Sequence, residues 1–441
     1  MNDAADKALL PAGLADRLPP EADHEEALTR CLLDRFASYG YRRVKPPMLE
    51  FETGLFDGVG ATVADQTFRI MDPVSQRMMG LRADITPQIA RIAATRLAAE
   101  PRPLRLSYSG EVLRVRGTQL RTERQFRQIG VELIGAASAA TGDAEVILLA
   151  AEGLGDIAVA GLSVDVNVPS LARTLIAALG VAAPLARRLL AAVDRKDAAG
   201  LDELAAGQGG LPSPPCGPKP PAFAKPASTL RSGSGAAAAA EDGPAGEGRS
   251  GDGPKRGRLG FAQAGEAARL LAKLVDAAGP AEAGMPALAR LELPQAAADL
   301  VQRLAEVVAL VRAAAPGLSL TVDAVESRGF EYHTGVSFTL FALGVRGELG
   351  SGGRYRTASG EPATGFTLFT DTLLRAAPAP EPRRRLLLPH GAPAEVARRL
   401  RADGWVVVQG LVATGDDAAE ARRLGCGHLW RAGDIAAVAR G

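Results

Sequence analysis

Residues 105–135 read RLSYSGEVLRVRGTQLRTERQFRQIGVELIG, and this stretch decides the fold that the sequence predicts. Two runs rich in apolar, β-branched and aromatic residues, Leu104–Leu113 and Gln125–Ile134, flank a polar loop. Short runs of this kind on either side of a polar connection are typical of sheet strands. The stretch therefore predicts two strands of a large antiparallel sheet.

The polar side chains of this stretch suggest binding chemistry. The loop and its flanks carry five arginines, Arg114, Arg116, Arg121, Arg124 and Arg127. Guanidinium groups suit the planar recognition of phosphate or carboxylate, although a solvated hairpin tip is the alternative. Gln128 and Glu132 lie four residues apart, and the two-residue period of a strand places both on one face. They could hold an ammonium or imidazolium group; an exposed polar sheet face is the alternative.

Outside this stretch, helical patterns alternate with short extended ones. Apolar spacing predicts helices over 21–40, 84–99, 143–155, 170–204 and 261–315. Thr86 is a possible cap of the second helix, and Pro87 suits its first position. Extended segments are predicted over 41–50, 68–81, 318–324, 336–343 and 347–355, and 365–374 leads into a last short helix or strand. These elements predict an α+β fold with a large antiparallel sheet and helices on one side of it.

Composition divides the chain. Residues 206–258 are dominated by Gly, Pro, Ala and Ser, with too little apolar content to offset chain entropy, and are predicted to be a low-complexity disordered insertion. The body then comprises residues 1–205 and 259–375, followed by a Pro/Arg-rich linker at 376–385. Residues 386–441 alternate short strands and helices, which predicts a small C-terminal α/β unit in which Trp405 and Trp430 pack.

Charge and cysteine content exclude several classes of protein. A net charge of +1 without a basic stripe gives no case for a dedicated nucleic-acid binder. The three cysteines form no CxxC pair, and His24, His390 and His428 lie apart, so neither a disulfide framework nor a metal site is expected, and no cofactor is implied. No signal peptide and no membrane-spanning apolar stretch is recognisable, which favours a cytoplasmic protein.

Several segments together carry a family resemblance. Residues 40–50, GYRRVKPPMLE, are similar to motif 1 of class II histidyl-tRNA synthetases, and residues 105–135 to motif 2. LRADITPQIAR at 81–91 resembles the family's LRPExT segment, and SRGFEYHTG at 327–335 its histidine-specific RGLDYY segment. GGRY at 352–355 with PATGF at 362–366 resembles GGRYD and motif 3. The resemblance implies a class II aminoacyl-tRNA synthetase-like sheet flanked by helices, with a motif 1 strand that pairs two chains across a two-fold axis.

The resemblance also implies a pocket for L-histidine. By matching position, Asp84 and Thr86 would hold the α-amino group, and Gln128 and Glu132 would flank the amine and the imidazole. Arg328 matches the arginine that contacts the carboxylate, and Arg114 is the retained motif 2 arginine. Tyr332 and His333 stand where the synthetases have two tyrosines. Such a pocket discriminates strongly because a wrong ligand leaves buried polar groups unpaired.

Three departures from the synthetase pattern bear on activity. Arg116 replaces the motif 2 glutamate, Thr372 replaces the motif 3 arginine that grips ATP, and Arg356 replaces the aspartate of GGRYD. Loss of a phosphate-binding arginine removes charge-assisted contacts to the transferring phosphate. The C-terminal unit is also shorter than the synthetases' anticodon-binding domain.

A retained amino-acid pocket with impaired ATP handling resembles the synthetase-like regulatory subunits of ATP phosphoribosyltransferase. This resemblance implies a non-catalytic subunit that activates a short-form catalytic partner and takes part in histidine feedback inhibition in the first step of histidine biosynthesis. A divergent, active histidyl-tRNA synthetase is the alternative, and an RNA-binding relative is a third possibility that the near-neutral charge disfavours. The insertion at 206–258 departs from the family's pattern.

Overall fold

The computed structural model describes residues 9–118, 121–206, 253–326, 332–431 and 433–439. The chain divides into two compact units, Met1–Pro378 and Ala379–Gly441. Most of the predicted insertion at 206–258 lies outside the described residues, but helix α9 (Gly253–Asp276) already includes 253–258. Within the described part of the chain, no helix combines the length and apolar character that a membrane crossing needs.

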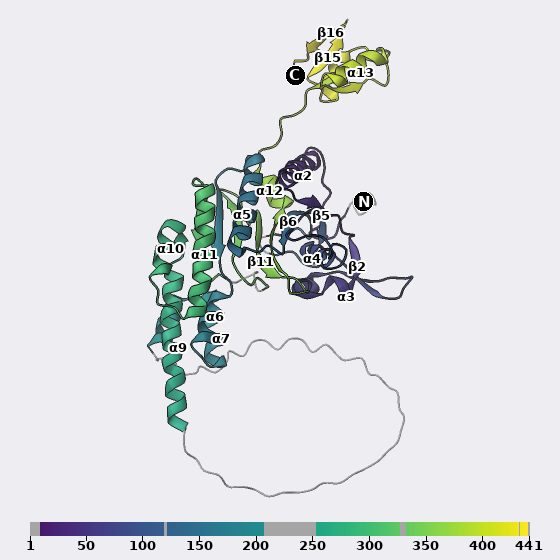
Figure 1. Ribbon diagram of the computed structural model, residues 1–441. Helices are drawn as coiled ribbons and strands as arrows, with labels where there is room; N and C mark the ends of the chain where they lie inside the picture. The colour runs from purple at the N-terminus through teal and green to yellow at the C-terminus, as the bar shows by residue number, and fades with distance from the viewer. Residues whose placement is uncertain (1–8, 119–120, 207–252, 327–331, 432, 440–441) are drawn as a thin grey trace, which may run out of the picture. The chain divides into compact units, whose positions relative to one another are not determined.

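A nine-stranded sheet forms the centre of the first unit (Figure 1). Its strands, in spatial order, are β1 (Arg42–Arg43), β5 (Leu104–Leu113), β6 (Gln125–Ile134), β12 (Pro362–Phe369), β11 (Gly350–Arg356), β10 (Ser337–Ala342), β7 (Leu162–Asn167), β9 (Ser319–Val322) and β8 (Gly279–Pro280). The two decisive strands begin and end where the sequence predicts, and they pair antiparallel with Tyr108 opposite Gly130. Residues between β1 and β5 in the sequence form a small three-stranded sheet, whose spatial order is β2 (Leu49–Phe51), β4 (Met78–Leu81) and β3 (Arg69–Met71).

Helices pack on both faces of the large sheet, so the expectation of helices on one side only is wrong. The helices of this unit are α2 (Glu21–Ser38), α3 (Glu52–Leu55), α4 (Thr86–Thr95), α5 (Ala139–Asp156), α6 (Leu171–Ala178), α7 (Ala183–Asp194), α8 (Ala198–Ala205), α9, α10 (Ala281–Ala289), α11 (Gln295–Ala314) and α12 (Thr370–Ala376), with a 3₁₀ helix η1 at Gly58–Gln66. The main core joins α2, α5 and α11 to one sheet face, which presents Ile129 and Val131 of β6. A second core joins α4 to the opposite face, which presents Phe126 and Ile134.

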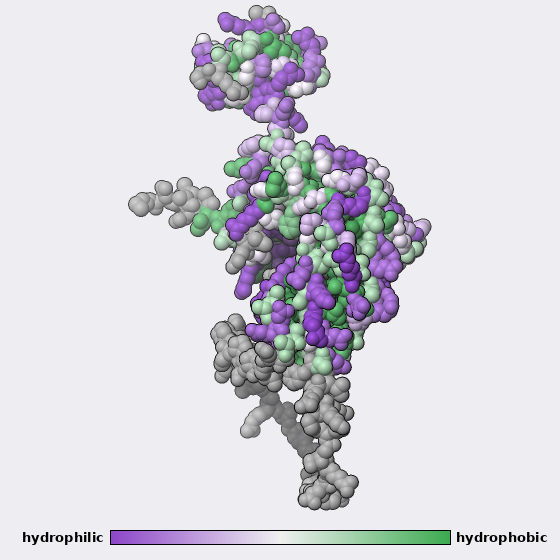
Figure 2. Space-filling model, turned by 90° about the vertical axis from the view of Figure 1, so that its left-hand side faces the viewer, coloured by the Kyte–Doolittle hydropathy of each residue, from purple (hydrophilic) through white to green (hydrophobic). Residues whose placement is uncertain are grey.

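Helix α11 illustrates why these segments become helices. Its apolar residues Leu300, Leu304 and Val311 recur at helical spacing and are buried in the main core. Helix α11 lies beside α5 (Figure 1), and the same side of the unit shows many hydrophilic residues at its surface (Figure 2). The helix therefore gains its stability mainly from packing one apolar face.

Two features of the sheet and one helix start differ from expectation. The sheet is not purely antiparallel, because β1 pairs parallel with β5 and β7 pairs parallel with β9. Strand β7 itself was not predicted. Thr86 does not cap α4: the helix begins at Thr86, and the carboxylate of Asp84 accepts a hydrogen bond from the Thr86 backbone N–H at 2.9 Å.

The second unit is a small α/β layer, as predicted. Its sheet has the order β14 (Val406–Gln409), β13 (Arg385–Leu388), β15 (His428–Arg431) and β16 (Asp434–Ala437), and β13 runs parallel to both neighbours. Alternate residues of β13 face α13 (Ala394–Ala402) and α14 (Asp417–Arg423). Trp405 and Trp430 pack at the edge of the core on the α13 side.

Candidate functional site

The sheet face covered by α4 carries a cluster of buried polar side chains. Gln128 and Glu132 both point to this face, as the two-residue period predicts, and are 0% and 1% exposed. They lie between Phe126 and Ile134 of the same strand, which belong to the apolar core under α4. Buried polar groups in such surroundings must find hydrogen-bond partners, so the partners define the site.

Gln128 fixes the segment that precedes α4. Its side-chain carbonyl accepts a hydrogen bond from the Ile85 backbone N–H at 3.0 Å, and its amide donates to Asp84 Oδ2 at 3.0 Å. The other oxygen of Asp84 accepts the bond from the Thr86 N–H. Gln128 thus positions the half-buried Asp84 carboxylate on the sheet face, with both ends of its own amide engaged by the protein.

Glu132 is a buried carboxyl group without a cationic partner among the described residues. The hydroxyl of Tyr355 donates to its Oε2 at 2.9 Å. Burial raises the pKa of Glu132 to about 8, although the hydroxyls of Tyr355 and Thr86 favour the charged form. Burial thus favours the protonated form of this carboxyl group, and a bound cation would favour the charged form.

A chain of hydroxyl groups lies beside these carboxyls, and the sequence analysis named only Thr86 among its members. Thr86 Oγ1 lies 3.3 Å from the Tyr108 hydroxyl, which lies 2.7 Å from Thr367 Oγ1. Burial, together with the charges of Glu132 and Asp84, raises the pKa of Tyr108 far above its usual range. The signal was present, because Tyr108 occupies the same sheet face as its neighbours Leu106 and Leu104, and Tyr355 belongs to the GGRY segment.

Aromatic rings close another side of the cluster. The Tyr332 ring stands edge-on to Tyr355 with 6.1 Å between centroids, and its centroid lies 4.0 Å from that of His333. Burial raises the pKa of Tyr332, and the charges of Asp84 and Glu132 raise it further. Arg328, the expected partner of a ligand carboxylate, lies outside the described residues.

Arg114 connects the cluster to a second group of charges. Its Nε donates to the Ala83 carbonyl at 3.3 Å, and its guanidinium lies 5.1 Å from the centroid of the Phe126 ring. Burial lowers the pKa of Arg114. Of the eight residues expected in the site, the structure thus brings Asp84, Thr86, Gln128, Glu132 and Tyr332 together, adds His333 through its ring contact, and leaves Arg114 at the border.

Next to Arg114, Arg121 and Asp371 form a buried ion pair at the start of α12. Arg121 Nε donates to Asp371 Oδ2 at 2.9 Å, and the guanidinium lies 3.8 Å from the Phe369 ring centroid and 4.8 Å from that of Phe126. Thr372 is 1% exposed and donates its hydroxyl to the Phe369 carbonyl at 2.9 Å. The residue that replaces the motif 3 arginine is therefore engaged by the backbone of its own helix start.

In the described ranges, no group of three or more His, Cys, Asp or Glu side chains is arranged to hold a metal ion. The groups gathered around Glu132 are carboxyls, hydroxyls and aromatic rings, which offer acid–base chemistry and hydrogen bonding. Two carboxyls, a run of hydroxyls and aromatic walls suit a small cation with polar substituents.

Comparisons with known proteins bear on the family of the chain. The family model described as histidyl-tRNA synthetase matches residues 13–231 and 258–373. The ATP phosphoribosyltransferase regulatory subunit of Rhodospirillum centenum is 49% identical over 429 residues, which cover 97% of this chain and 96% of that protein. The protein of the same name from Paramagnetospirillum magneticum is 48% identical over 428 residues, 97% of each chain.

Solved structures show the same fold at lower identity. The ATP phosphoribosyltransferase regulatory subunit/histidyl-tRNA synthetase of Bacillus halodurans aligns with a TM-score of 0.69 at 22% identity, covering 94% of this chain and 96% of that one. The histidyl-tRNA synthetase of a Nostoc species aligns with a TM-score of 0.68 at 16% identity, covering 96% and 90%. The α+β, class II synthetase-like fold predicted from the sequence is thereby confirmed. The chain belongs to the family of ATP phosphoribosyltransferase regulatory subunits, built on the histidyl-tRNA synthetase fold.

Proposed function

We propose that this chain is a cytoplasmic, non-catalytic subunit that binds L-histidine and activates a short-form ATP phosphoribosyltransferase catalytic subunit. In the complex it takes part in histidine feedback inhibition of the first step of histidine biosynthesis. The names and coverage of the relatives support the partner, and the polar cluster around Glu132 supports the ligand.

L-Histidine is proposed as the ligand mainly because of two carboxyl groups, Asp84 and Glu132. Neither forms an ion pair with a described residue. A histidine zwitterion supplies an ammonium group for one of them and an imidazole for the other. The hydroxyls of Tyr108 and Tyr355 hydrogen-bond to Thr367 and to Glu132, and so hold the polar groups of the cluster in place for such a ligand. In this proposal, Arg328 binds the carboxylate of the ligand.

The proposal that the chain does not catalyse adenylate formation rests on the residues near motif 3. Adenylate formation needs fixed cations around the ATP phosphates. Arg121 is committed to Asp371 and to two phenyl rings, and Thr372 offers only a hydroxyl that the Phe369 carbonyl engages. This arrangement favours a binding protein over an adenylating enzyme.

Self-association is proposed through the segment 40–50. Strand β1 lies at one edge of the large sheet, Arg42 and Arg43 are exposed, and β1 pairs only with β5 among the described strands. An unpaired sheet edge is a natural place for a second copy to pair across a two-fold axis.

The test is the phosphoribosyltransferase activity of a short-form catalytic subunit from the same source, with and without this chain and with and without L-histidine. Activation by the chain and inhibition by histidine only in the complex are expected. Replacing Glu132 with Gln should weaken the inhibition while leaving complex formation intact. Unchanged activity and no complex would refute the proposal, and histidine-dependent ATP–pyrophosphate exchange would assign the chain to the synthetases instead.

A further inference from the structure

The four-stranded sheet of the C-terminal unit ends on one side at β14, with no described strand beyond it. Residues 405–415, which contain β14, read WVVVQGLVATG and include neither a charged residue nor a proline. Exposed sheet edges of soluble proteins usually carry a charge, a proline or a bulge that prevents another strand from adding to them. The other edge strand of the same sheet, β16, follows this rule, since it begins with Asp434. Strand β14 is therefore an edge to which a further strand can add.

The parallel pairing with β13 decides which backbone groups of β14 face the open edge. The N–H groups of Val406 and Gly410 donate to backbone carbonyls at either end of β13, at 3.0 and 2.8 Å. Peptide groups of a strand point alternately to its two sides, so those of Val406, Val408 and Gly410 point to β13. The N–H and C=O groups of Val407 and Gln409 consequently point outward, to the side on which no described strand lies.

These outward groups select one register for a second copy of the same strand. An antiparallel register that sets Val407 of each copy against Gln409 of the other pairs all of these groups within the strand. Val408 of one copy then lies opposite Val408 of the other, on a two-fold axis, so the contact is isologous. A strand without charges suits such a contact, because no like charges meet across the axis.

The side chains that flank β14 fit the same register. Leu411 and Val412 follow the strand and are 87% and 67% exposed. Trp405 precedes the strand and is only partly buried, on the α13 side of the sheet together with Val407. Counting outward from the axis places Leu411 of one copy opposite Trp405 of the other. Pairing therefore covers apolar side chains at both ends of the strand as well as its backbone.

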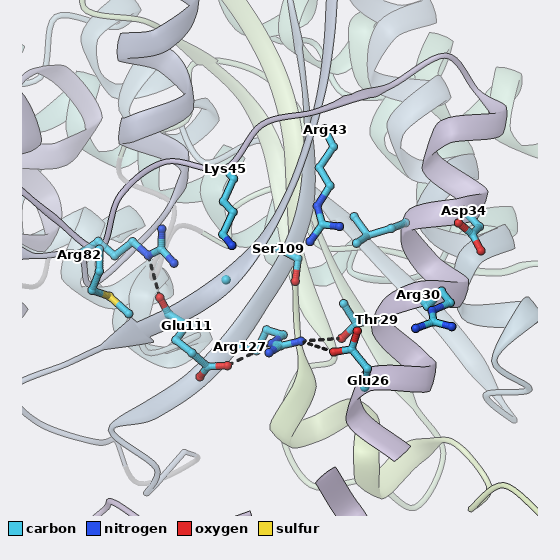
Figure 3. Close-up of a pocket in the computed structure, with 13 residues that line it drawn as sticks. Glu26, Thr29, Arg30, Asp34, Arg43, Lys45, Arg82, Ser109, Glu111 and Arg127 are labelled. Carbon is cyan, nitrogen blue, oxygen red and sulfur yellow. Dashed lines mark hydrogen bonds and ion pairs between the residues drawn. The ribbon is translucent and has the colours of Figure 1, made fainter. Parts of the chain in front are cut away.

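We propose that β14 pairs antiparallel with β14 of a second copy of this chain, so that the two small sheets become one continuous sheet. This contact does not rest on the proposed function, and it is separate from the contact proposed through segment 40–50. Figure 3 shows two cations of that segment, Arg43 and Lys45, in the space beside α2. Association through segment 40–50 is therefore expected to respond to salt, whereas pairing of the uncharged β14 is not. A chain with two different two-fold contacts forms assemblies larger than a dimer.

The test is sedimentation velocity of the full chain over a range of concentrations, at low salt and again at high salt. A reversible association step that persists at high salt is expected. The variant Gln409→Pro removes an N–H group that points away from its own sheet, a position at which an edge strand tolerates proline. It should weaken this step by roughly tenfold or more, since the two-fold axis removes two hydrogen bonds per pair. The matched control, Gln409→Ala, keeps the N–H group and should associate as the wild type does.

A charge placed beside the strand tests the contribution of the side chains. Leu411→Lys should also weaken the step, because the ammonium group would lose solvation against Trp405. Leu343→Lys is the matched control: Leu343 is 86% exposed and lies in the first unit, so the same change in net charge should leave the step unchanged. Tryptophan fluorescence during urea unfolding verifies that the C-terminal unit of each variant is folded, since both tryptophans lie there.

A cysteine on the two-fold axis tests the register. Facing residues of a pair that is not hydrogen-bonded have Cα atoms about 4.5 Å apart, within the range of a disulfide. Mild oxidation of Val408→Cys should therefore yield a covalent dimer. Val406→Cys, whose counterpart in this register is Gly410, should yield far less, and equal yields from the two variants would overturn the register.

The same experiments can overturn the contact itself. A wild type without a salt-resistant association step, or a Gln409→Pro variant that associates as the wild type does, would exclude pairing of β14 between copies. Equal weakening by Leu411→Lys and Leu343→Lys would reduce the effect to net charge. If Gln409→Pro sediments as the wild type does but no longer binds a short-form catalytic subunit, the edge serves a different protein, and the second copy is excluded.

Discussion

The substitution Glu132→Gln tests the electrostatics of the carboxyl cluster directly. In the folded protein the pKa of Glu132 is raised from 4.5 to about 8, first of all by burial. Between these two pH values the folded protein holds a proton that the unfolded chain has released. The free energy of unfolding therefore falls as pH rises, by up to about 1.4 kcal/mol per pH unit. The stability that this proton provides is fully present below pH 4.5 and is lost as pH rises through about 8.

The difference between the two pKa values sets the size of this stability change. Above pH 8 the free energy of unfolding is lower by at most about 5 kcal/mol, and relaxation of the protein around the charged carboxylate reduces this loss toward a few kcal/mol. Glutamine keeps the shape and can still accept the Tyr355 hydroxyl, but it does not titrate. The variant should match the wild type near pH 5 and exceed it in stability by a few kcal/mol near pH 9.

The assay must observe the correct unit. Both tryptophans, Trp405 and Trp430, lie in the C-terminal unit, whereas all five tyrosines lie in the first unit. Urea unfolding followed by the tyrosine signal in near-ultraviolet circular dichroism therefore reports on the cluster, and tryptophan fluorescence provides an internal reference. A pH-independent difference between variant and wild type would refute a buried, protonated Glu132.

Glu145→Gln is the matched control with the opposite sign. Burial acts to raise the pKa of Glu145, but hydrogen bonds from Arg105 and Tyr41 outweigh it and leave the pKa below its ordinary value. A depressed pKa gives stability above the unfolded value that is lost as pH falls through the folded one. This variant should therefore be less stable than the wild type at neutral pH, with the difference fading in acid.

Three further predictions follow from the same geometry. If Glu132 ionises on binding L-histidine, titration at pH 7 should release about one proton per site. Calorimetry in buffers of different ionisation enthalpy measures it, and a heat that is independent of buffer would contradict it. Tyr355→Phe removes the donor to Glu132 Oε2 and should lower the free energy of unfolding of the first unit by about 1–3 kcal/mol in urea titrations. No loss would mean that water replaces the hydroxyl. Arg121→Ala leaves Asp371 buried and should lower that free energy by about 3 kcal/mol, of which Arg121→Leu/Asp371→Leu recovers part; additive losses would argue against a coupled pair.

The elements that follow from local periodicity were predicted from the sequence, and those that depend on pairing between distant segments were missed. Strands β5 and β6 follow from ten-residue apolar patterns on either side of a polar loop, and their bounds agree with the structure. Strand β7 is six residues long, and its partners β10 and β9 lie more than a hundred residues away, so no local pattern required it. The start of α4 differs from the prediction for a similar reason: the distant Gln128 holds Asp84 where its carboxylate accepts the Thr86 N–H at the helix start.

The arginine-rich loop shows most clearly where sequence reasoning ends. Its arginines formed one candidate anion site in the sequence, but the fold separates them. Arg121 pairs with Asp371 between two phenyl rings, and Arg124 donates to the carbonyls of Arg114 and Ala12. Arg127 faces the opposite side of the sheet from its neighbour Gln128, because successive side chains of a strand alternate. Neighbours along a strand thus fall in different sites. Arg43 and Arg127, which do line one space, are brought together by the pairing of β1 with β5 and of β5 with β6.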